Sequence, residues 1–506
     1  MGIISKFKID KKKDSTLGFY FGHTEAEGEN KQGIQNHTNF FEDYLQVLNQ
    51  IKDERFIFIG RKGSGKSAIA KFIQDTSDSS DDSFATIIRI NELELERVIQ
   101  SIPKEEFQDS EIILFEWLIL VKLISLLVKN KDAVYTTEYK KLNDFLKRNA
   151  GFVDIDKFQV VEIIEKRKLE VSFDVLRHAF SAFGRYFDSK TVKAPFYKLI
   201  PPLKEIIQQV LAFEVFKNKE FWILFDDLDI NFKEEDEASS QKIVNLLRVV
   251  KNLNTSILKN SGARVLIFLR DDVKRIIETF DTDTSKIFTS YEVPLNWYDH
   301  EIFKLNENQT NLKRFINKRI SLNFKNHAIP FDEDDPWSTL FEEYQNSYGG
   351  KSSFKYILDF TFYRPRDLVL FLNPLGKKDY RFPVKPDYAK QLIKSFVSEN
   401  INEIKSELKI HFRSDQIINL FNRLKTITNR YGALTKEETL KQLTGITPQK
   451  SSEEILKILL DYSILVYKDN YGRIYFNYRY DNNTIGFENM KLTTHKCIYT
   501  YFNPES

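Results

Sequence analysis

The feature that most constrains the fold of this chain is a glycine-rich segment between two regular elements. It reads Gly60-Arg61-Lys62-Gly63-Ser64-Gly65-Lys66-Ser67, with the apolar run 56–59 before it and the amphipathic run 68–73 after it. A buried strand, a glycine-rich turn and a helix in this order predict a phosphate-binding loop. Glycines let successive backbone N–H groups point at one anion, and the helix N-terminus adds its dipole.

The spacing within this loop assigns a role to individual residues. Lys66 would reach the β- and γ-phosphates of a nucleotide, and the Ser67 hydroxyl would ligate Mg²⁺. The expected nucleotide-binding residues of the loop are Gly60, Arg61, Lys62, Gly63, Ser64, Gly65, Lys66, Ser67 and Ala68. The starting hypothesis is therefore a nucleotide site.

Length and composition describe a globular chain. Its 506 residues suffice for about three domains of ordinary size. Apolar residues make up 42%, and only 13 Pro and 18 Gly are present, which argues against long flexible linkers. The formal charge of +2 gives no global electrostatic case for nucleic-acid or membrane binding, although local patches are compatible with it.

The sequence predicts a cytoplasmic protein with no membrane partner. Cys497 is the only cysteine, so no intrachain disulfide forms, and the seven histidines show no metal-ligand spacing. The Lys-rich N-terminus has no apolar core behind it, so no secretory signal is expected. The apolar run from Ile112 to Val128 carries Glu116 and Lys122, which favours a buried helix over a membrane span.

A second motif begins at Phe221. Five apolar residues, 221–225, predict a buried strand, and Asp226 and Asp227 follow directly. In open α/β sheets the ligand lies outside the carboxyl ends of the strands, so these acids are expected to face the nucleotide. Asp226 would hold Mg²⁺ through water, and Asp227 would orient or deprotonate the attacking water. The alternative is a polar turn without function.

Further strands and a helix complete the predicted core. A third strand, 263–269, ends at Arg270, which would lie beside the acidic strand end and near the γ-phosphate; a solvated arginine at a turn is the alternative. The run 85–90 predicts another core strand, and 291–295 predicts the sheet edge, because Pro294 cannot donate to a ladder. The run 239–253 predicts a helix between the strands.

The remaining N-terminal half is predicted to be helical. A helix from Phe40 to Ile51, capped by the polar run 36–39, precedes the core. A long insertion, about 95–218, shows apolar residues at three- and four-residue spacing, with breaks expected at Gly151 and at Pro201-Pro202.

Residues 296–410 predict a helical lid. Within it, Pro365 suits the first position of a helix, which puts Arg366 in the first turn and Arg364 just before it. Cations there oppose the helix dipole, so a compensating anion is expected, either Asp367 or a bound phosphate. The acidic run 332–335 favours a solvated loop over a metal site.

The C-terminal segment predicts a winged helix-turn-helix. Helices are expected at 415–430, from Thr435 and from Ser451, followed by a hairpin of 464–467 and 474–478 around the turn 470–472. The third helix carries Glu453, Glu454 and Asp461 against Lys457, which favours a protein contact over DNA. The wing residues Arg473 and Arg479 keep a DNA contact open.

Together these motifs resemble the P-loop ATPases of the AAA+ and STAND type (the ASCE class), and more narrowly the bacterial stand-alone P-loop ATPases associated with phage defence. The resemblance implies that Arg270 acts as sensor 1 and Arg366 as sensor 2, with Arg364 as the alternate. It also implies that the run 21–25 is an adenine-side motif. One departure is Asp227, where typical AAA+ proteins have Glu, so hydrolysis is expected to be slow or stimulated by a partner.

The resulting hypothesis is an α/β P-loop NTPase fold with a parallel sheet, a large helical insertion, a helical lid and a C-terminal winged helix. The expected domains are an N-terminal segment (1–50), an ATPase core (51–295), the lid (296–410) and the winged helix (411–506). The expected cofactors are ATP and Mg²⁺, with Ser67 and Asp226 as metal ligands and Lys66, Asp227, Arg270 and Arg366 as catalytic residues.

Several functions stay open. The leading one is an ATPase switch in antiviral defence, with a second copy of the chain or a protein effector as partner. The alternative is a DNA-binding AAA+ ATPase of the origin-recognition or loader type. A site that binds nucleotide only as a structural element is a third, and a small-molecule kinase is the weakest.

Overall fold

A five-stranded parallel sheet organises the first half of the chain. The computed structural model describes residues 15–24, 40–89, 110–149, 170–343, 345–476 and 490–504, except 178 and 231. The chain divides into two compact units: unit 1 is Met1–Gln32 with Asn296–Ser506, and unit 2 is Gly33–Leu295. The strands of the unit 2 sheet are β1 (Ile57–Gly60), β2 (Ser83–Arg89), β5 (Glu220–Asp226), β6 (Ala263–Arg270) and β7 (Glu292–Pro294).

The strand order is β2-β5-β6-β1-β7, and all neighbouring strands are parallel. One strand, β6, therefore lies between the strand of the glycine-rich loop and the strand that ends in acids. This is a P-loop NTPase-like sheet, and the predicted parallel α/β core is confirmed. The prediction that Pro294 marks the edge is also confirmed, because β7 is an outer strand.

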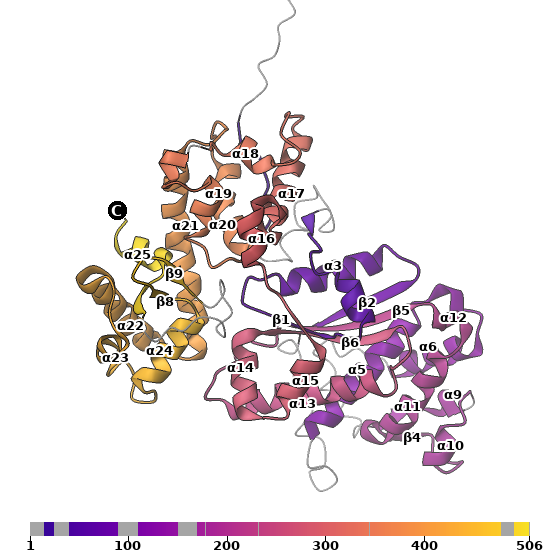
Figure 1. Cartoon of the computed structure of the whole chain (residues 1–506). Helices are drawn as coiled ribbons and strands as arrows, with labels where there is room; N and C mark the ends of the chain where they lie inside the picture. Colours follow the sequence, from indigo (N-terminus) through magenta and orange to yellow (C-terminus); the bar gives the residue numbers. More distant parts are fainter. Residues whose placement is uncertain are drawn as a thin grey trace, which may run out of the picture. The chain divides into compact units, whose positions relative to one another are not determined.

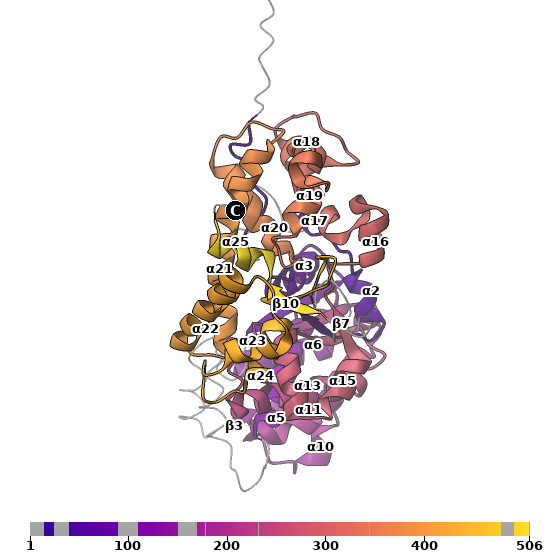
Figure 2. The same cartoon turned by 60° about the vertical axis from the view of Figure 1, so that its left-hand side comes forward.

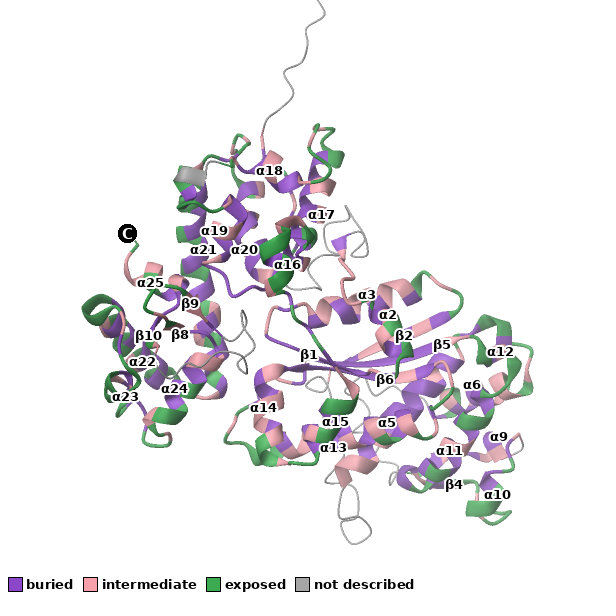
Figure 3. Cartoon of the chain, in the orientation of Figure 1, coloured by how far each residue is buried: buried purple, intermediate pink, exposed green. Residues whose placement is uncertain are grey.

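The central strands are buried on both faces, as their uninterrupted apolar runs predict. β1 is buried along its whole length, and Figure 3 shows the inner strands in purple. Stacked rings join neighbouring strands: Phe58 lies 5.1 Å from Phe268, and Phe84 lies 5.3 Å from Phe221, between ring centroids. Such aromatic pairs add about 0.5–1.5 kcal/mol each beyond the burial of their area.

Helices cover both faces of this sheet (Figure 1). The helix after the glycine-rich loop, α3, lies on one face, and α5 and α13 lie on the other. The helices next to the sheet are α2 (Val47–Lys52), α3 (Lys66–Asp78), α5 (Ser110–Leu127), α13 (Glu237–Thr255), α14 (Asp271–Phe280) and α15 (Thr284–Tyr291). The apolar run at 112–128 is the buried helix α5, as predicted. Among the described residues, no helix is both long enough and apolar enough to cross a membrane.

The helix predicted at 40–51 is shorter in the structure. Its helical part, α2, begins only at Val47, because Gln46 takes a left-handed conformation with φ 51°. The Asp43 carboxylate accepts the Val47 N–H at 3.0 Å and so satisfies the first turn. The polar run expected to cap this helix, 36–39, lies outside the described residues.

The insertion is mostly helical, and one predicted break is wrong. Pro201 and Pro202 lie inside α11 (Phe196–Leu211), which runs on through both. Its buried apolar face packs against α5, and this burial outweighs the backbone hydrogen bonds that two prolines remove. Gly151 is outside the described residues. The other insertion elements are η3 (Lys131–Ala133), α6 (Thr137–Arg148), β3 (Glu170–Ser172), α9 (Asp174–Arg177), α10 (Phe183–Tyr186), β4 (Lys193–Pro195) and α12 (Glu214–Lys217).

Unit 1 begins with helices around a buried core. They are α16 (His300–Leu305), η4 (Glu307–Gln309), α17 (Asn311–Asn326), α18 (Pro336–Leu340), η5 (Gln345–Tyr348), α19 (Ser353–Leu358), α20 (Pro365–Lys377), α21 (Pro386–Glu407) and η6 (Leu408–Ile410). Residues 15–24 pack onto this unit. The Asn323 side chain exchanges two hydrogen bonds with the Tyr20 backbone, at 2.6 and 2.7 Å, and Phe19 meets Phe324 edge to face.

The described C-terminal part of unit 1 contains four α-helices, a π-helical turn and a small sheet, and Figure 2 shows this part of the chain. They are α22 (Ser414–Thr426), the π-helical turn η7 (Ile427–Tyr431), α23 (Lys436–Leu443), α24 (Ser452–Asp461), β8 (Leu465–Lys468), β9 (Ile474–Tyr475), β10 (Lys491–Thr494) and α25 (Lys496–Phe502). The predicted caps at Thr435 and Ser451 are confirmed as capping boxes, and the predicted hairpin is confirmed as β8 paired with β9.

The antiparallel sheet of this part has a third strand, β10, which pairs with β8 and which the sequence pattern did not predict. The helix predicted at 415–430 changes to a π-helical turn after Thr426. Residues 477–489, including Arg479, lie outside the described residues.

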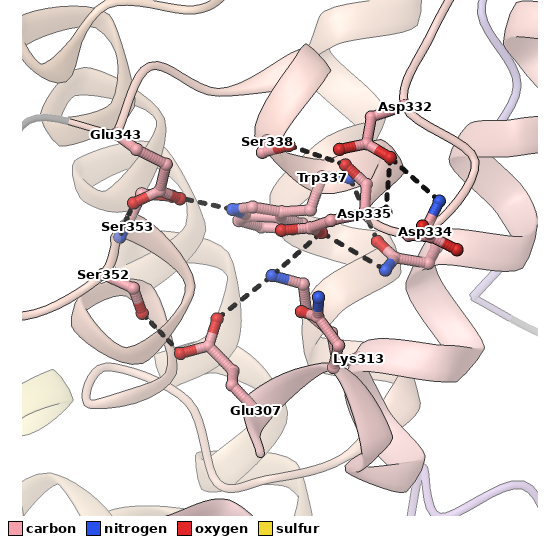
Figure 4. A network of polar contacts seen from close by, with 12 residues as sticks. Glu307, Lys313, Asp332, Asp334, Asp335, Trp337, Ser338, Glu343, Ser352 and Ser353 are labelled. Carbon is pink, nitrogen blue, oxygen red and sulfur yellow. Dashed lines mark hydrogen bonds and ion pairs between the residues drawn. The ribbon is translucent and has the colours of Figure 1, made fainter.

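The acidic run 332–335 belongs to a polar network centred on Lys313 (Figure 4). The side chain of Lys313 is 1% exposed; its ammonium donates to Glu307 at 3.0 Å and pairs with Asp335 at 3.3 Å. It also lies 4.8 Å from the centre of the Phe354 ring. Residues 332–334 are exposed, which fits the predicted solvated loop, and the described residues contain no acid or histidine cluster suited to a metal.

The first prediction concerns this network. Lys313→Met would leave Asp335 without its cation and Glu307 with only the longer cation contact, to Lys355, at 3.8 Å. Breaking a buried pair in this way costs about 3–5 kcal/mol. We expect a loss of that size in the free energy of unfolding of the full chain, measured in urea by far-UV circular dichroism and tryptophan fluorescence. The matched control is Lys286→Met, since Lys286 and its partner Asp283 are 84% and 75% exposed. A loss below 1 kcal/mol for Lys313→Met would contradict a structural role.

Candidate functional site

The parallel register aligns the ends of four strands at one edge of the unit 2 sheet. Gly60, at the end of β1, lies opposite Arg270, at the end of β6. Asp226, at the end of β5, lies opposite Arg89, at the end of β2. The glycine-rich loop, the acidic strand end and two arginines therefore meet at the carboxyl edge, where open α/β sheets bind their ligands.

The backbone of the glycine-rich loop requires its glycines. Gly63 and Gly65 have φ angles of 79° and 99°, which glycine adopts without the steric cost that other residues would have. At Gly60 a Cβ atom would clash with the Ser64 hydroxyl and lie 2.9 Å from the Leu295 Cβ. The Ser64 N–H donates to the Arg61 carbonyl at 3.1 Å and closes the turn before α3 begins.

Lys66, the first residue of α3, folds back over the loop. Its ammonium donates to the carbonyls of Gly60 and Arg61, both at 3.0 Å. Burial lowers the pKa of Lys66, and the nearby Asp229 acts in the opposite direction. The ammonium is thus held above the loop by two weak acceptors, which an anion in the loop would outcompete because it carries charge.

Asp226 is a buried acid of the site with a raised pKa. Burial, with Asp227 beside it, raises the pKa of Asp226 to about 6, and a hydrogen bond from the Ser67 side chain acts against this rise. Its Oδ2 atom is buried and accepts no hydrogen bond from any described residue. A buried carboxylate oxygen without a donor, next to a serine hydroxyl, has the donor set that Mg²⁺ prefers. Ser67 and Asp226 therefore fit a magnesium ion.

Asp227 is turned away from its neighbour by the backbone. Its φ of 57° is left-handed, a conformation that aspartate tolerates better than most residues. Its carboxylate pairs with Arg89 at 3.1 Å, and the side chains are 32% and 25% exposed respectively. The two adjacent acids consequently have different surroundings, one buried and one half-exposed against an arginine.

Arg270 lies beside the acidic strand end, where the sequence predicted it. Its guanidinium forms a two-point pair with Asp272, with Nε donating at 2.9 Å, and Nη1 pairs with Asp229 at 3.0 Å. The side chain is 6% exposed. Arg270 is therefore held in one orientation by acids that follow β5 and β6.

The arginines of the predicted lid have different surroundings in unit 1. Pro365 occupies the first turn of α20, as predicted, and Asp367 supplies the compensating anion. Arg364 is fully buried and donates to Asp367 at 2.9 Å and to Glu407 at 2.7 Å. Arg366 pairs with Glu403 at 3.2 Å, and its side chain is 16% exposed.

Burial would lower the pKa of Arg364, but Asp367 and Glu407 outweigh this effect and raise it. Arg364 thus acts as the cationic centre of a buried network within unit 1. For Glu403, burial raises the pKa and Arg366 lowers it.

Two residues of the site were not singled out from the sequence. Arg89, which pairs with Asp227, is a charged residue at the end of a core strand. Arg270 was identified as a charged residue at the end of a strand, and the same criterion would have identified Arg89. Asp272 directly follows the Arg270-Asp271 pair, but its two-point contact with Arg270 depends on the start of α14. Of the adenine-side motif, Phe21 is buried in unit 1 beside Phe19, and Glu25 lies outside the described residues.

Three comparisons relate this chain to known proteins. The FunZ-associated C-terminal helical domain matches residues 310–379, in unit 1. The chain is 24% identical, over 506 residues, to the putative transposon gamma-delta 80.3 kDa protein of Escherichia coli (strain K12), covering 96% of this chain and 67% of that protein. It is also similar to the structure of the Aeropyrum pernix ORC2 protein in its ADP form, with 10% identity, a TM-score of 0.30, and coverage of 93% of this chain and 98% of that one.

These similarities assign no family to the whole chain. The domain match spans a small part of it, and the superposition on the ORC2 structure is too loose to carry the fold. The fold rests on the strand order and register described above.

The second prediction concerns the buried acid. Because folding raises the pKa of Asp226 from about 3.9 to about 6, the folded state binds a proton more tightly, and stability falls as pH rises through this window. Asp226→Asn removes the ionisable group and with it the free-energy cost of keeping a buried carboxylate ionised. In the absence of ligands we expect it to raise the free energy of unfolding by about 1–3 kcal/mol at pH 8 and by almost nothing at pH 4.

Urea denaturation of the wild type and of Asp226→Asn across this pH range tests the expectation. Asp229→Asn is the matched control, since Asp229 is paired with Arg270 and its removal should destabilise at pH 8. An equal effect of Asp226→Asn at both pH values would contradict the assignment of a strained, ionised acid.

Proposed function

We propose that this chain binds Mg²⁺-ATP at the carboxyl edge of the unit 2 sheet and hydrolyses it slowly, as a nucleotide-dependent switch. One observation carries the proposal: the glycine-rich loop, the buried Asp226 and the Ser67 hydroxyl lie together at this edge. A structural anion site would not need a buried carboxylate, which repels anions unless a cation lies between them.

In the proposed complex the loop N–H groups and the N-terminus of α3 hold the phosphates. Lys66 exchanges its carbonyl acceptors for phosphate oxygens, and Ser67 and Asp226 are the protein ligands of the magnesium ion. The ion would neutralise charge that develops on the phosphates during transfer. Asp227 would then orient the attacking water and accept its proton.

The pairing of Asp227 supports slow turnover. Its carboxylate is both shorter than a glutamate and engaged with Arg89 at 3.1 Å, so water must compete with a guanidinium for the same oxygen. A partner that displaced Arg89 would raise the rate. This fits a switch better than a fast hydrolase.

Arg270 and Arg366 are the proposed sensors of the γ-phosphate. Arg270 would exchange Asp229 for the phosphate while keeping Asp272 as its support. Arg366 is preferred over Arg364 for the role in unit 1, because the contacts of Arg364 with Asp367 and Glu407 are needed inside that unit. We further propose antiviral defence as the biological output, which rests on the resemblance alone.

A DNA-binding ATPase of the origin-recognition or loader type remains the second candidate. The observation that favours it is the set of three helices, α22, α23 and α24, followed by an antiparallel sheet, which has the elements of a winged helix. The E. coli relative is described as a transposon protein, which is compatible with work on DNA.

The third prediction separates binding from chemistry. Lys66→Ala should weaken ATP binding about 50-fold, since hydrogen bonds between charged groups contribute roughly 1.5–3 kcal/mol. Asp227→Asn should keep the ATP affinity within about 3-fold but lower phosphate release about 100-fold or more, the usual effect of losing a general base. Binding is measured with a fluorescent ATP analogue in Mg²⁺, and turnover by phosphate release.

The matched control is Lys71→Ala, which removes the same charge from the same helix, and which should change neither quantity by more than about 2-fold. If the wild type releases no more phosphate than Lys66→Ala, with and without DNA, the chain is not an ATPase. If Lys66→Ala binds ATP like the wild type, the proposed nucleotide site is wrong.

The fourth prediction concerns Arg89. Arg89→Gln should free the Asp227 carboxylate and raise basal phosphate release about 2- to 5-fold, the factor that corresponds to a half-exposed ion pair of up to 1 kcal/mol. Arg89→Lys, which keeps the charge, should stay near the wild-type rate. A fall in rate for Arg89→Gln with unchanged ATP binding would show instead that Arg89 supports catalysis.

A further inference from the structure

The outer face of α22 and η7 has a charge pattern that differs from the rest of the C-terminal part. α22 buries Ile417, Leu420 and Leu424, and η7 continues this buried side with Ile427. The opposite side is exposed (Figure 3). Its exposed cations are Arg423, Lys425 and Arg430, and the amides of Asn422 and Asn429 are exposed as well. Arg423 and Lys425, two positions apart, lie on opposite flanks of this exposed side.

This face is basic, whereas the following helices are not. Residues 413–431 contain four Lys or Arg against one Asp, and residues 432–462 contain four Lys against five Asp or Glu. Within the part of the chain that the structure describes, Arg423, Lys425 and Arg430 form no ion pair. The single acid, Asp415, lies at the other end of α22, 3.9 Å from Arg413.

Helix stability explains only part of this pattern. Because η7 continues α22 without a break, the C-terminal end of the helix dipole lies at η7, and its favourable interaction with a cation accounts for Arg430 in the last turn. Arg423 and Lys425 lie earlier in the continuous helix, where the dipole effect is weaker. The π-helical turn itself is a feature that occurs frequently at functional sites. Its guanidinium lies 5.5 Å from the ring centre of Tyr431, and Tyr431 is 40% exposed.

The elements that a winged helix commonly uses for DNA are less suitable here. On α24, Glu453 and Glu454 are exposed, and both would repel phosphates. In the hairpin, Arg473 is paired with Asp469 at 2.7 Å, so its charge is largely balanced. Among the described residues of this part, exposed cations without an ion pair lie on α22 and η7, where three of them face a single acid, and also on the small sheet, where Lys468 on β8 lies opposite Lys491 on β10.

We propose that the outer face of α22 and η7 binds the phosphate backbone of a nucleic acid. Arg423, Lys425 and Arg430 contact phosphates, the amides of Asn422 and Asn429 donate to the same backbone, and the Tyr431 ring offers a stacking surface. Charge complementarity selects this occupant, because the face carries cations and amides with Ile418 as its one exposed aliphatic residue. The proposal deepens the second candidate function and does not require the chain to hydrolyse ATP.

The test uses the full chain and a fluorescent 30-base-pair DNA duplex of mixed sequence, without nucleotide, in fluorescence anisotropy from 50 to 300 mM NaCl. In the triple variant Arg423→Ser, Lys425→Ser, Arg430→Ser, three phosphate contacts are lost. We expect the slope of log K against log salt to become shallower by about 2–3, and the affinity at 100 mM salt to fall about 10- to 100-fold. The thermal unfolding temperature of the variant should be lowered only slightly, since all three side chains are exposed and only their interaction with the helix dipole is lost.

The matched control is Lys436→Ser, Lys441→Ser, Lys457→Ser, which removes three exposed charges from α23 and α24. It should change the slope by less than 1. Equal losses of DNA affinity in both variants would show that only the net charge of the chain matters, which would overturn the proposal. Absence of DNA binding by the wild type would overturn it as well. Tighter binding of poly-glutamate than of DNA, with the same dependence on the three residues, would assign the face to an acidic protein instead.

Lys66→Ala keeps this outcome separate from that of the ATPase proposal. If the variant binds DNA like the wild type but binds no ATP, the two sites are independent. Loss of ATP binding then says nothing against the α22 face, and loss of DNA binding says nothing against the nucleotide site.

Discussion

The parallel register of the unit 2 sheet is the constraint on which the candidate site depends. Parallel strands have their carboxyl ends on one edge, so each residue that follows a strand is brought to the same edge whatever its distance in sequence. Gly60 and Arg270 are opposite one another across β1 and β6, and Arg89 and Asp226 across β2 and β5. A slip of one residue in either pair would turn these side chains to the other face.

Among the described residues at this edge, the arginines at the ends of β2 and β6 are paired with acids, whereas Lys66 and Asp226 form no ion pair. Arg89 balances Asp227, and Arg270 balances Asp229 and Asp272. Asp226 has a serine hydroxyl and one buried oxygen without a donor, and its pKa is raised to about 6. A stable fold gains nothing from an ionised acid in this position, and the magnesium ion proposed above would account for its presence.

Much of the core could be predicted from the sequence, because it depends on local patterns. The strand from Phe221 and the cap at Ser451 follow from apolar runs and capping chemistry, and both are present. The features that the sequence did not predict depend on packing partners that are distant in sequence. Pro201 is tolerated because α11 packs against α5, and the short strand β10 exists because β8 offers it an edge. Neither partner is visible from the segment itself.

The two arginines of the predicted lid also show what a local sequence pattern cannot predict. Arg364 and Arg366 flank Pro365, and the sequence cannot tell which is structural. In the structure Arg364 is the N-cap residue of α20 in an extended conformation, while Tyr363 before it is left-handed with φ 57°. This turn directs Arg364 into a buried group of acids and leaves Arg366 on the helix with one carboxylate, that of Glu403. Backbone geometry at a single residue thus gives the two arginines different surroundings, with Arg364 held by two buried carboxylates and Arg366 by one.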